Sequence, residues 1–356
     1  MTRPLDQAHT DKTRTRADAV AAFRLRDAAV WLLPISLAWS IHQLSSDSQA
    51  PAWVAWQVFF GVHALIPLLD LLLGQDHAAP RTGRPHLITR LVLLGCLPAW
   101  MGVLLVGAAI SGGLDTLAWW GLALSCGATG GIVAINVGHE LIHRASRLDR
   151  TVGGLLLASV SYGAFQVEHV RGHHLRVATN EDPATARQGE SLWAFVPRSV
   201  LGTLRHALQI DAARGRHETL AWSALTVLLW IAVAAVWGLG ALCFVWVASA
   251  VAIVELEVVN YIEHYGLQRT RLSDGRYEPV DHRHSWNANS TLINAFLLNL
   301  QRHADHHAHA GKPHTALRSE PDAPQLPAGY GAMVLIAWIP PLWRAIMDPR
   351  IPRVRP

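Results

Sequence analysis

Residues 116–144 read TLAWWGLALSCGATGGIVAINVGHELIHR, an apolar run that ends in a pair of histidines. Residues 116–138 are apolar enough to cross roughly 30 Å of hydrocarbon as one helix, which takes about 20 residues. The motif GHELIHR that closes the stretch places His139 and His143 four residues apart, with Glu140 between them. On a helix these two imidazoles share a face, and zinc peptidases use the same spacing with the glutamate as general base. The stretch predicts a membrane helix with metal ligands at its end, and it leaves the metal and the reaction open.

The composition indicates a membrane protein. Of the 356 residues, 51% are hydrophobic and 16% are charged, whereas an ordinary soluble domain has about a quarter charged residues. The three cysteines, Cys96, Cys126 and Cys243, lie in apolar runs without a CxxC motif, so neither a disulfide framework nor a thiolate metal site is expected. The net charge of +4 is small and its basic residues are scattered, which gives nucleic-acid binding no support. The 20 histidines are the unusual feature.

Hydropathy predicts an all-α integral membrane protein with six transmembrane helices in a single domain, 1–356. Each predicted span approaches the length of about 20 apolar residues that a membrane requires. The spans are 28–44, 52–73, 88–110, 116–138, 219–237 and 239–260, of which the first is the shortest. Two other apolar stretches, 153–165 and 331–346, are too short or too interrupted by proline to span, and we expect them to be re-entrant or interfacial.

The charges of the loops predict the orientation. The tail of about 1–27 is polar and rich in arginine, without the apolar segment of a signal peptide. Lysine and arginine are absent from 45–51, 111–115 and 236–240, while the tail, the 81–90 loop and the segment after 138 contain several arginines. Because positive loops stay in the cytoplasm, we expect both termini and the 139–218 segment on the cytoplasmic side of a bacterial inner membrane.

Three further histidine motifs lie on the same predicted side as His139 and His143. They are EHVRGHH, NYIEHYG and LQRHADHHAH, which contribute His169, His173, His174, His264, His303, His306, His307 and His309. Several are spaced i,i+3 or i,i+4, so that each helical set projects from one face. Acids that could orient the second ring nitrogen of a ligand lie nearby, and they are Glu140, Glu168, Asp182, Glu257, Glu263 and Asp305.

The number of histidines argues against a peptidase. A lone histidine such as His264 is more often a packing residue than a ligand, but three clusters at ligand spacing on one membrane face indicate a metal centre. A catalytic zinc takes about three protein ligands, and the histidines here suffice for two metals. Imidazole ligands suit iron, which changes oxidation state where zinc does not. We therefore expect oxygen activation rather than hydrolysis at a histidine-rich di-iron site.

These motifs resemble those of the membrane alkane 1-monooxygenases, within the wider family of membrane desaturases and hydroxylases. The resemblance covers about 30–350 and includes PLLDLLLGQD (67–76), GESLWAFVPRS (189–199) and HSWN (284–287). It implies a non-haem centre of two iron ions that uses O2 to convert medium- to long-chain n-alkanes into primary alcohols. The implied ligands are His139, His143, His169, His173, His174, His264, His303, His306 and His307, with His284 and His309 in supporting positions.

The sequence departs from the family pattern at a few positions. Arg144 replaces the more common lysine, Asn180 a proline and Ala304 a serine, and the AGKPHTAL stretch (310–317) is unusual. None of these departures removes a ligand, but they leave substrate preference open. A related desaturase or a xylene-type methyl hydroxylase is the alternative, followed at a distance by a zinc peptidase or a metal transporter.

The resemblance also implies a substrate path and partners. A tunnel between helices would deliver alkane from the bilayer, and the small Val62 on the second helix would allow longer chains. The sequence has neither a dinucleotide-binding fingerprint nor cysteines for a redox site. We therefore expect a separate rubredoxin as the electron donor, with an NADH-dependent rubredoxin reductase upstream and no fused rubredoxin domain. Rubredoxins tend to be acidic, and the arginines expected to form their docking face include Arg144, Arg147, Arg171 and Arg302.

Overall fold

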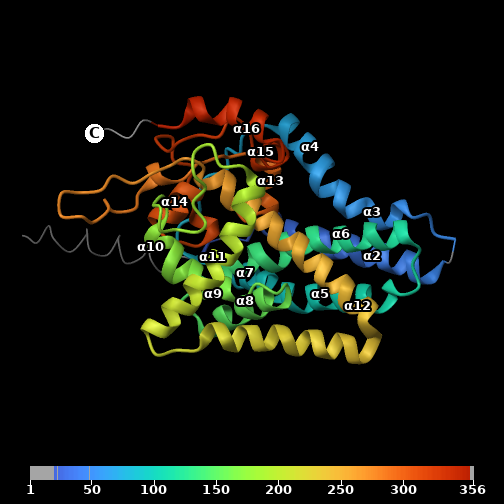
Figure 1. Cartoon of the computed structure of the whole chain (residues 1–356). Coiled ribbons are helices and arrows are strands. Elements are labelled where there is room, and N and C mark those ends of the chain that lie inside the picture. Colours follow the sequence, from blue (N-terminus) through green and yellow to red (C-terminus); the bar gives the residue numbers. More distant parts are fainter. Residues whose placement is uncertain (1–19, 22, 48, 353–356) are drawn as a thin grey trace, which may run out of the picture.

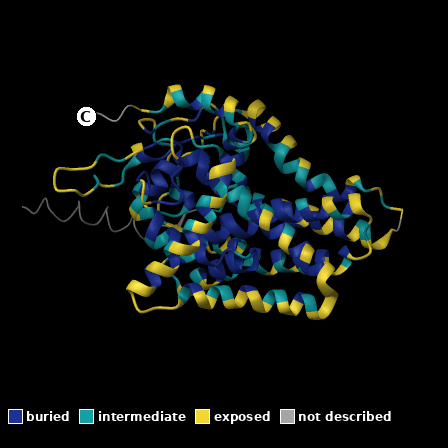
Figure 2. Ribbon diagram, viewed as in Figure 1, coloured by how far each residue is buried: buried dark blue, intermediate teal, exposed yellow. Residues whose placement is uncertain are grey.

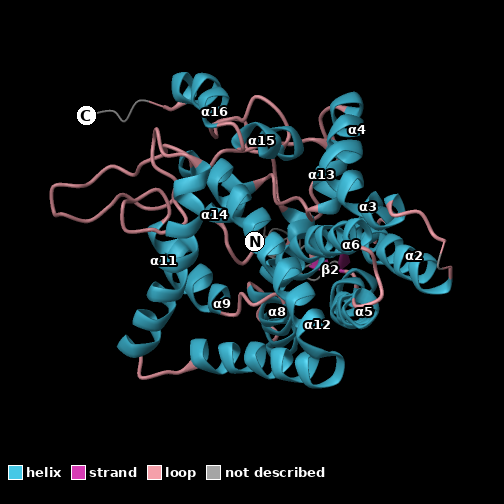
Figure 3. Ribbon diagram, turned by 45° about the vertical axis from the view of Figure 1, so that its right-hand side comes forward, coloured by secondary structure: helices cyan, strands magenta, loops and turns pink. Residues whose placement is uncertain are grey.

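The protein is built almost entirely of helices. The computed structural model describes residues 20–21, 23–47 and 49–352, which excludes most of the predicted polar tail. In this part of the chain, the strands β1 (Val20–Ala21) and β2 (Arg84–Pro85) form a parallel pair of two residues each. Helices make up nearly all the remaining regular structure (Figure 3). The predicted all-α class is confirmed.

Four helices are long and apolar enough to cross a membrane. Trp53–Leu73 consists of α3 (Trp53–Phe60), the π-helical η2 (Gly61–Leu65) and α4 (Ile66–Leu73). Thr116–Ile142 consists of α6 (Thr116–Thr129), the π-helical η3 (Gly130–Asn136) and α7 (Val137–Ile142). The other two are α5 (Leu87–Ser111) and α12 (Glu218–His264). The chain is therefore a membrane protein.

The predicted count of six spans is matched only in part. Gly238 has φ 84° and ψ 178°, which divides α12 into two arms. A positive φ of this kind favours glycine. The arms correspond to the predicted spans 219–237 and 239–260, and the second arm runs back from the turn at an angle to the first (Figure 1). The predicted first span corresponds to α2 (Leu32–Ser46), whose 15 residues are short of the length of a full crossing.

The two ends of the helical bundle differ in character. The connections from α2 to α3 and from α5 to α6, and the turn that divides α12, lie at the right-hand end in Figure 1. The histidine-bearing α7, α10 (His174–Arg176) and α14 (His303–Ala308) lie toward the opposite end. Loops without lysine or arginine are thus separated from the histidines, which is the relative arrangement that the charge pattern predicts.

The helix Thr116–Ile142 forms the centre of the bundle. In its apolar window 89% of residues are buried, compared with 22% in the most apolar window of α12, and the interior is dark blue in Figure 2. It packs against α3 and α12. A Cβ on Gly127 would collide with Val251, and one on Gly121 would collide with Trp56. These glycines bring the neighbouring helices close to the one that carries His139.

Shorter elements complete the histidine end. Between α7 and α12 they are α8 (Arg147–Ser159), α9 (Ala164–Glu168), the π-helical η4 (His169–His173), α10 and α11 (Leu192–Ala213). After α12 they are η5 (His282–His284), α13 (Thr291–Phe296), α14, η6 (His314–Ala316), α15 (Tyr330–Ala337), α16 (Pro340–Met347) and η7 (Asp348–Arg350). The stretches 153–165 and 331–346 fall among them, and neither belongs to a candidate span.

The described end of the polar tail is anchored to the histidine end. It leads into η1 (Leu25–Trp31), where Arg26 pairs with Asp76 at 2.7 Å and the buried Asp27 with Arg81 at 2.6 Å. Asp76 also binds Arg302 at 3.1 Å, next to His303. These ion pairs connect the start of the described chain, the end of α4 and the start of α14.

Candidate metal centre

Nine histidines from four parts of the chain converge at one end of the bundle. The end of the central helix supplies His139 and His143, the η4–α10 segment supplies His169, His173 and His174, the last residue of α12 is His264, and α14 supplies His303, His306 and His307. Their ring nitrogens form two groups, in each of which one nitrogen per residue lies within 4.8 Å of the others. The convergence unites segments far apart in sequence.

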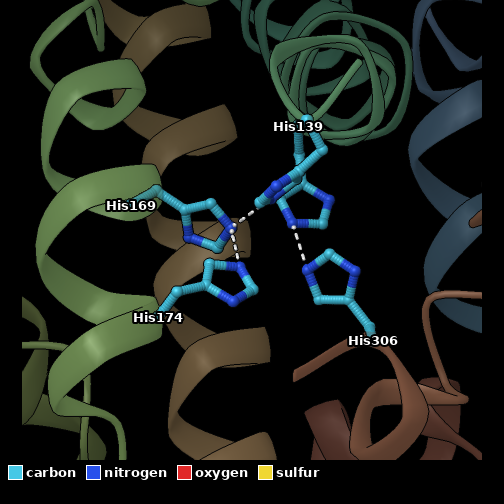
Figure 4. Close-up of side chains that lie close together, drawn as sticks. His139, His169, His174 and His306 are labelled. Atoms are coloured by element: carbon cyan, nitrogen blue, oxygen red, sulfur yellow. Dashed lines mark hydrogen bonds between the residues drawn. The ribbon is translucent and has the colours of Figure 1, made fainter. Parts of the chain in front are cut away.

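The first group has five histidines, and we call it the five-histidine group. It consists of His139, His143, His169, His174 and His306. The Nε2 atoms of His139 and His306 are 3.2 Å apart, and those of His169 and His174 are 3.1 Å apart (Figure 4). The Nε2 atom of His169 also lies 3.0 Å from that of His143. His143 and His174 are partly exposed and the other three are buried.

The second group, the four-histidine group, is buried throughout. It consists of His173, His264, His303 and His307. The Nε2 atoms of His173 and His307 are 3.2 Å apart, and those of His264 and His303 are also 3.2 Å apart. The last residue of α12 thus faces the first residue of α14, and the two groups share the segments η4–α10 and α14 as sources of ligands.

The division between the groups differs from the one that local spacing predicts. His139 and His143, spaced i,i+4, lie in the same group, but His169 and His173 with the same spacing are separated. Residues His169–His173 form a π-helix, in which hydrogen bonds link residues five apart. This winding brings His169 to the side of His174 and turns His173 toward His307.

The nitrogen spacing fits metal ions better than hydrogen bonds. A neutral imidazole has one N–H and one acceptor nitrogen, so the Nε2 atom of His169 cannot make full hydrogen bonds with both His143 and His174. Two nitrogens about 2.1 Å from one ion and at right angles there are about 3.0 Å apart. The five-histidine group also exceeds the four ligands of a typical zinc site. Both groups have donor sets that could hold a metal ion.

Carboxylates contact the four-histidine group directly. Asp182 Oδ2 lies 2.9 Å from Nδ1 of His173 and accepts a 2.6 Å hydrogen bond from Thr185. Since the carboxylate accepts the Nδ1 proton, the Nε2 lone pair of His173 is free for a metal. Glu263 Oε2 lies 3.2 Å from Nε2 of His303, so one carboxylate oxygen borders this group.

The other predicted supporting residues lie farther from the ring nitrogens that converge. Glu140 bonds Arg144 and the backbone and ring of His314. Glu168 lies 3.6 Å from the ring of His206. Asp305 binds His309, whose ring is 65% exposed, and Lys312. His284 contacts Glu278 and Asp281. These four residues lie in or beside elements that supply a ligand. Their side chains contact the residues just named, none of which is one of the nine histidines.

The protonation of the histidines favours metal binding near neutral pH. Burial, and then the repulsion of neighbouring rings, lower the pKa values of His169 and His174 well below the ordinary range. Burial lowers the pKa of His306 to about 4. His173 differs: burial lowers its pKa, but the combined attraction of Asp182, Glu168 and Glu257 outweighs burial and raises it. Most of the rings therefore present lone pairs without first losing a proton.

A chain of apolar cavities leads from the histidines toward the membrane. The inner cavity is lined by His139, His169 and His303. It shares Ile132, Glu255, Val259 and Leu297 with a middle cavity, which Val62 also lines. The middle cavity shares His63 and Glu255 with an outer one, lined by Phe59, Phe60 and Trp338. Val62 thus lines the middle cavity, and its role in a substrate tunnel stays a prediction.

Two features of the site were missing from the sequence-based prediction. His314 is buried and bonds Glu140, although it falls in the unusual AGKPHTAL stretch and no role was assigned to it. His63 and Glu255 lie 3.1 Å apart inside membrane helices. An ionisable residue within an apolar span is itself a signal of function, and it would have identified both members of this pair.

The prediction that Arg302 belongs to a docking face is wrong. This side chain is 4% exposed and binds Asp76, so it stabilises the fold. Arg144 pairs with Glu140 and Arg171 with Glu218, both largely inside the protein. Arg147, at the start of α8, is exposed.

Comparison with known proteins identifies the family. The profile of the fatty acid desaturases matches residues 114–336, which contain all nine histidines. The chain therefore belongs to the fatty acid desaturase family. Within it the chain groups with alkane 1-monooxygenases.

Two relatives illustrate this grouping, and a third, less similar one has a different name. Alkane 1-monooxygenase 1 of Pseudomonas aeruginosa is 39% identical over 349 residues, covering 92% of this chain and 91% of the relative. Alkane 1-monooxygenase 2 of Alcanivorax borkumensis is 36% identical, with 91% and 89% covered. The xylene/toluene monooxygenase hydroxylase component XylM of Pseudomonas putida is 28% identical, with 79% and 78% covered.

Proposed function

We propose that this protein is an alkane 1-monooxygenase that converts medium- to long-chain n-alkanes and O2 into primary alcohols. One observation carries the proposal: two groups of converging imidazoles border the inner end of an apolar cavity chain. Apolar lining suits a substrate without polar groups, and imidazole groups suit redox-active iron. The alkane 1-monooxygenases to which the chain is similar support the same activity.

The proposed ligands of two iron ions are the nine histidines, five for one ion and four for the other. When bound, the irons supply the redox chemistry that activates O2. Asp182 fixes the tautomer and orientation of His173, and Glu263 offers an oxygen beside His303. The buried surroundings exclude water from the four-histidine group, and the apolar walls of the inner cavity hold the chain end of the substrate near His139.

Electrons must come from another protein, and we propose a separate rubredoxin reduced by an NADH-dependent rubredoxin reductase. The sequence has no motif for a hydride-transferring cofactor. Of the four arginines named for the docking face, Arg147 is the exposed one. If charge guides docking, turnover with rubredoxin falls as ionic strength rises; turnover independent of salt contradicts this mode of docking.

The proposed location is the bacterial inner membrane, with six spans and with the termini and metal centre in the cytoplasm. Support comes from the arginine-free loops, which lie at the end opposite the histidines. A cysteine introduced at Gln49 should react with an impermeant thiol reagent from the periplasmic side. One introduced at Asp274, in the loop after α12, should react only after the membrane is opened.

The decisive experiment is product analysis with purified protein, rubredoxin and its reductase. Octane or hexadecane should give the primary alcohol, with oxygen from ¹⁸O2, and metal analysis should find two irons per chain. An alkene would favour a desaturase, and efficient oxidation of xylene but not of octane would favour an aryl-methyl hydroxylase. A single zinc without oxidation products would contradict the proposal.

A further inference from the structure

A histidine and a glutamate face each other within the membrane-spanning helices. His63 lies in η2 and Glu255 in the second arm of α12, with Nε2 and Oε1 3.1 Å apart. Their side chains are 21% and 17% exposed. Ionisable residues inside membrane spans are rare and commonly mark ligand or proton pathways. This pair belongs to neither histidine group.

The hydrogen-bond partners determine how many protons the pair holds. Nδ1 of His63 lies 2.9 Å from the carbonyl oxygen of Phe59, which only accepts, so Nδ1 carries a proton. At 3.1 Å the Nε2 and Oε1 atoms attract each other only if the pair holds one more proton, on the ring or on the carboxyl group. The pair therefore has no net charge and stays polar at its cavity face.

Glu255 lies where the three cavities meet. It lines the inner, middle and outer cavities, and His63 lines the middle and outer ones. Oε2 of Glu255 lies against Gly131 in η3, where a Cβ would collide with it. Two π-helical segments, η2 and η3, thus border the carboxylate, and π-helical turns often occur at functional sites.

Stability does not explain the pair. A buried ion pair is often no more stable than two apolar side chains of similar volume, because both groups lose their hydration. The neighbouring lining, which includes Phe59, Val62 and Ile132, is apolar. A polar pair at the junction therefore indicates a ligand that has a polar group at this point of the path.

We propose that His63 and Glu255 form a hydroxyl-binding site that takes the CH2OH end of a primary alkanol. The hydroxyl donates to the carboxylate, and the apolar cavities take the chain. Glu255 precedes Glu263 by eight residues on α12, or about 12 Å of helix rise. The site is thus away from the histidines and on the path toward the membrane. This proposal rests on the proposed function in one respect, since the alkanol is the product of the proposed reaction.

The consequence is selective retention of product over substrate. An alkane has no donor for the carboxylate and passes the junction. The hydroxyl of an alkanol that leaves the inner cavity donates a hydrogen bond there. Without this partner the hydroxyl would cross an apolar path unpaired, which is unfavourable.

The test measures binding to the metal-depleted protein in nanodiscs. Labelled 1-dodecanol and n-dodecane are equilibrated with protein-containing and empty nanodiscs, and the difference gives binding corrected for partition into lipid. The wild-type protein should bind the alkanol about tenfold more tightly than the alkane, which corresponds to one hydrogen bond to a charged group. Equal binding of the two ligands overturns the proposal.

The variants separate hydroxyl recognition from the shape of the path. H63L/E255L should lose the preference for alkanol while still binding n-dodecane, and E255Q, whose amide also bonds a hydroxyl, should keep most of it. H42L removes an exposed histidine from α2 and should bind as the wild type does. If H63L/E255L fails to fold, H63F/E255M retains more of the original bulk and serves instead.

Two further outcomes for the variants would contradict the hydroxyl-binding site. An unchanged preference in the double variant, or a parallel loss of both ligands, shows that the pair only shapes the path and overturns the proposal. Because binding is measured without metal, failure of the wild-type enzyme to hydroxylate octane would refute the proposed function alone.

Discussion

The two histidine groups differ in what surrounds them. The five-histidine group has two partly exposed members, and the contacts described for the nearby Glu140 lead away to Arg144 and His314. The four-histidine group is buried throughout, with Asp182 on His173 and Glu263 beside His303. The five-histidine group has more imidazoles. The four-histidine group has carboxylates that orient its imidazole rings and compensate the charge of a bound ion.

This difference suggests two ways to hold an ion. Extra ligands can compensate for exposure to water, whereas buried carboxylates fix fewer ligands in the required tautomer. We therefore expect the four-histidine group to be more sensitive to the loss of any one residue.

Removing a ligand should have the largest effect. His264→Ala leaves three imidazoles in the four-histidine group, while His143→Ala leaves four in the other. We expect His264→Ala to lower the iron content toward one per chain and to lower octane hydroxylation by more than about 100-fold. This exceeds the loss of about 10- to 100-fold that is typical when a residue that only supports a ligand is removed. His143→Ala should lose less iron. Metal analysis and gas chromatography measure both, and equal iron loss would remove the proposed distinction.

Removing the carboxylate that orients His173 should have the second-largest effect. Asp182→Asn keeps the shape of the side chain but removes the charge that orients His173. Iron retention against a chelator should fall about 10- to 100-fold. Glu181→Gln, next to it in sequence, is the matched control and should retain iron normally. Wild-type retention in Asp182→Asn would show that the carboxylate is dispensable.

The corresponding change beside the five-histidine group should be milder. Glu140→Gln weakens the contacts with Arg144 and His314. It also removes a negative charge that favours the protonated ring of His306, but no hydrogen bond to a histidine of the group. We expect iron retention or turnover to fall by less than about tenfold, with no proteolytic activity in either protein. A loss as large as that of Asp182→Asn would mean that Glu140 supports the metal directly.

Acid should destabilise the metal-free protein. The pKa of His306 is about 4 in the fold, because burial disfavours the charged ring, and about 6.5 in an unfolded chain. Between these values the unfolded chain binds more protons, so the free energy of unfolding falls as pH falls from 6.5 toward 4. His173 opposes this trend because its pKa is raised.

Thermal unfolding of the metal-depleted protein between pH 7.5 and 5 measures this effect. The midpoint should fall with pH in the wild-type protein and less steeply in His306→Gln. A midpoint that rises on acidification would mean that raised pKa values such as that of His173 dominate.

A change far along the path should have the smallest effect at the histidines. Val62→Trp fills the middle cavity that Val62 lines. We expect turnover of octane to fall by less than about tenfold and that of hexadecane to fall further, because overpacking blocks the longer chain. Iron content should not change. An unaltered longest substrate would show that Val62 does not limit chain length.

Much of the fold followed from local patterns. A run of about 20 apolar residues can satisfy its backbone in a membrane only as a helix. The helices Trp53–Leu73, Leu87–Ser111 and Thr116–Ile142 could therefore be predicted directly, to within a few residues at their ends. The 15-residue α2 was harder, because a short apolar helix and a spanning one share the same composition. The buried position of Arg302 depends on Asp76, over 200 residues earlier, and local sequence does not contain that contact.

By itself the sequence determined which side chains meet at the centre. Histidines at helical spacing, on loops and helix ends of one predicted membrane face, were sufficient to predict that they meet, since loop charge and hydropathy are local properties. All nine histidines that the resemblance implies as ligands lie in the two groups.

Only the tertiary structure decided how the histidines divide. The π-helix at His169–His173 and the approach of α14 to the end of α12 place His173 and His169 in different groups. The same is true of His63 and Glu255, which are 192 positions apart and are brought to 3.1 Å by the packing of two helices. Helix winding and helix packing are set by contacts between distant residues, and for this reason spacing along the chain does not contain them.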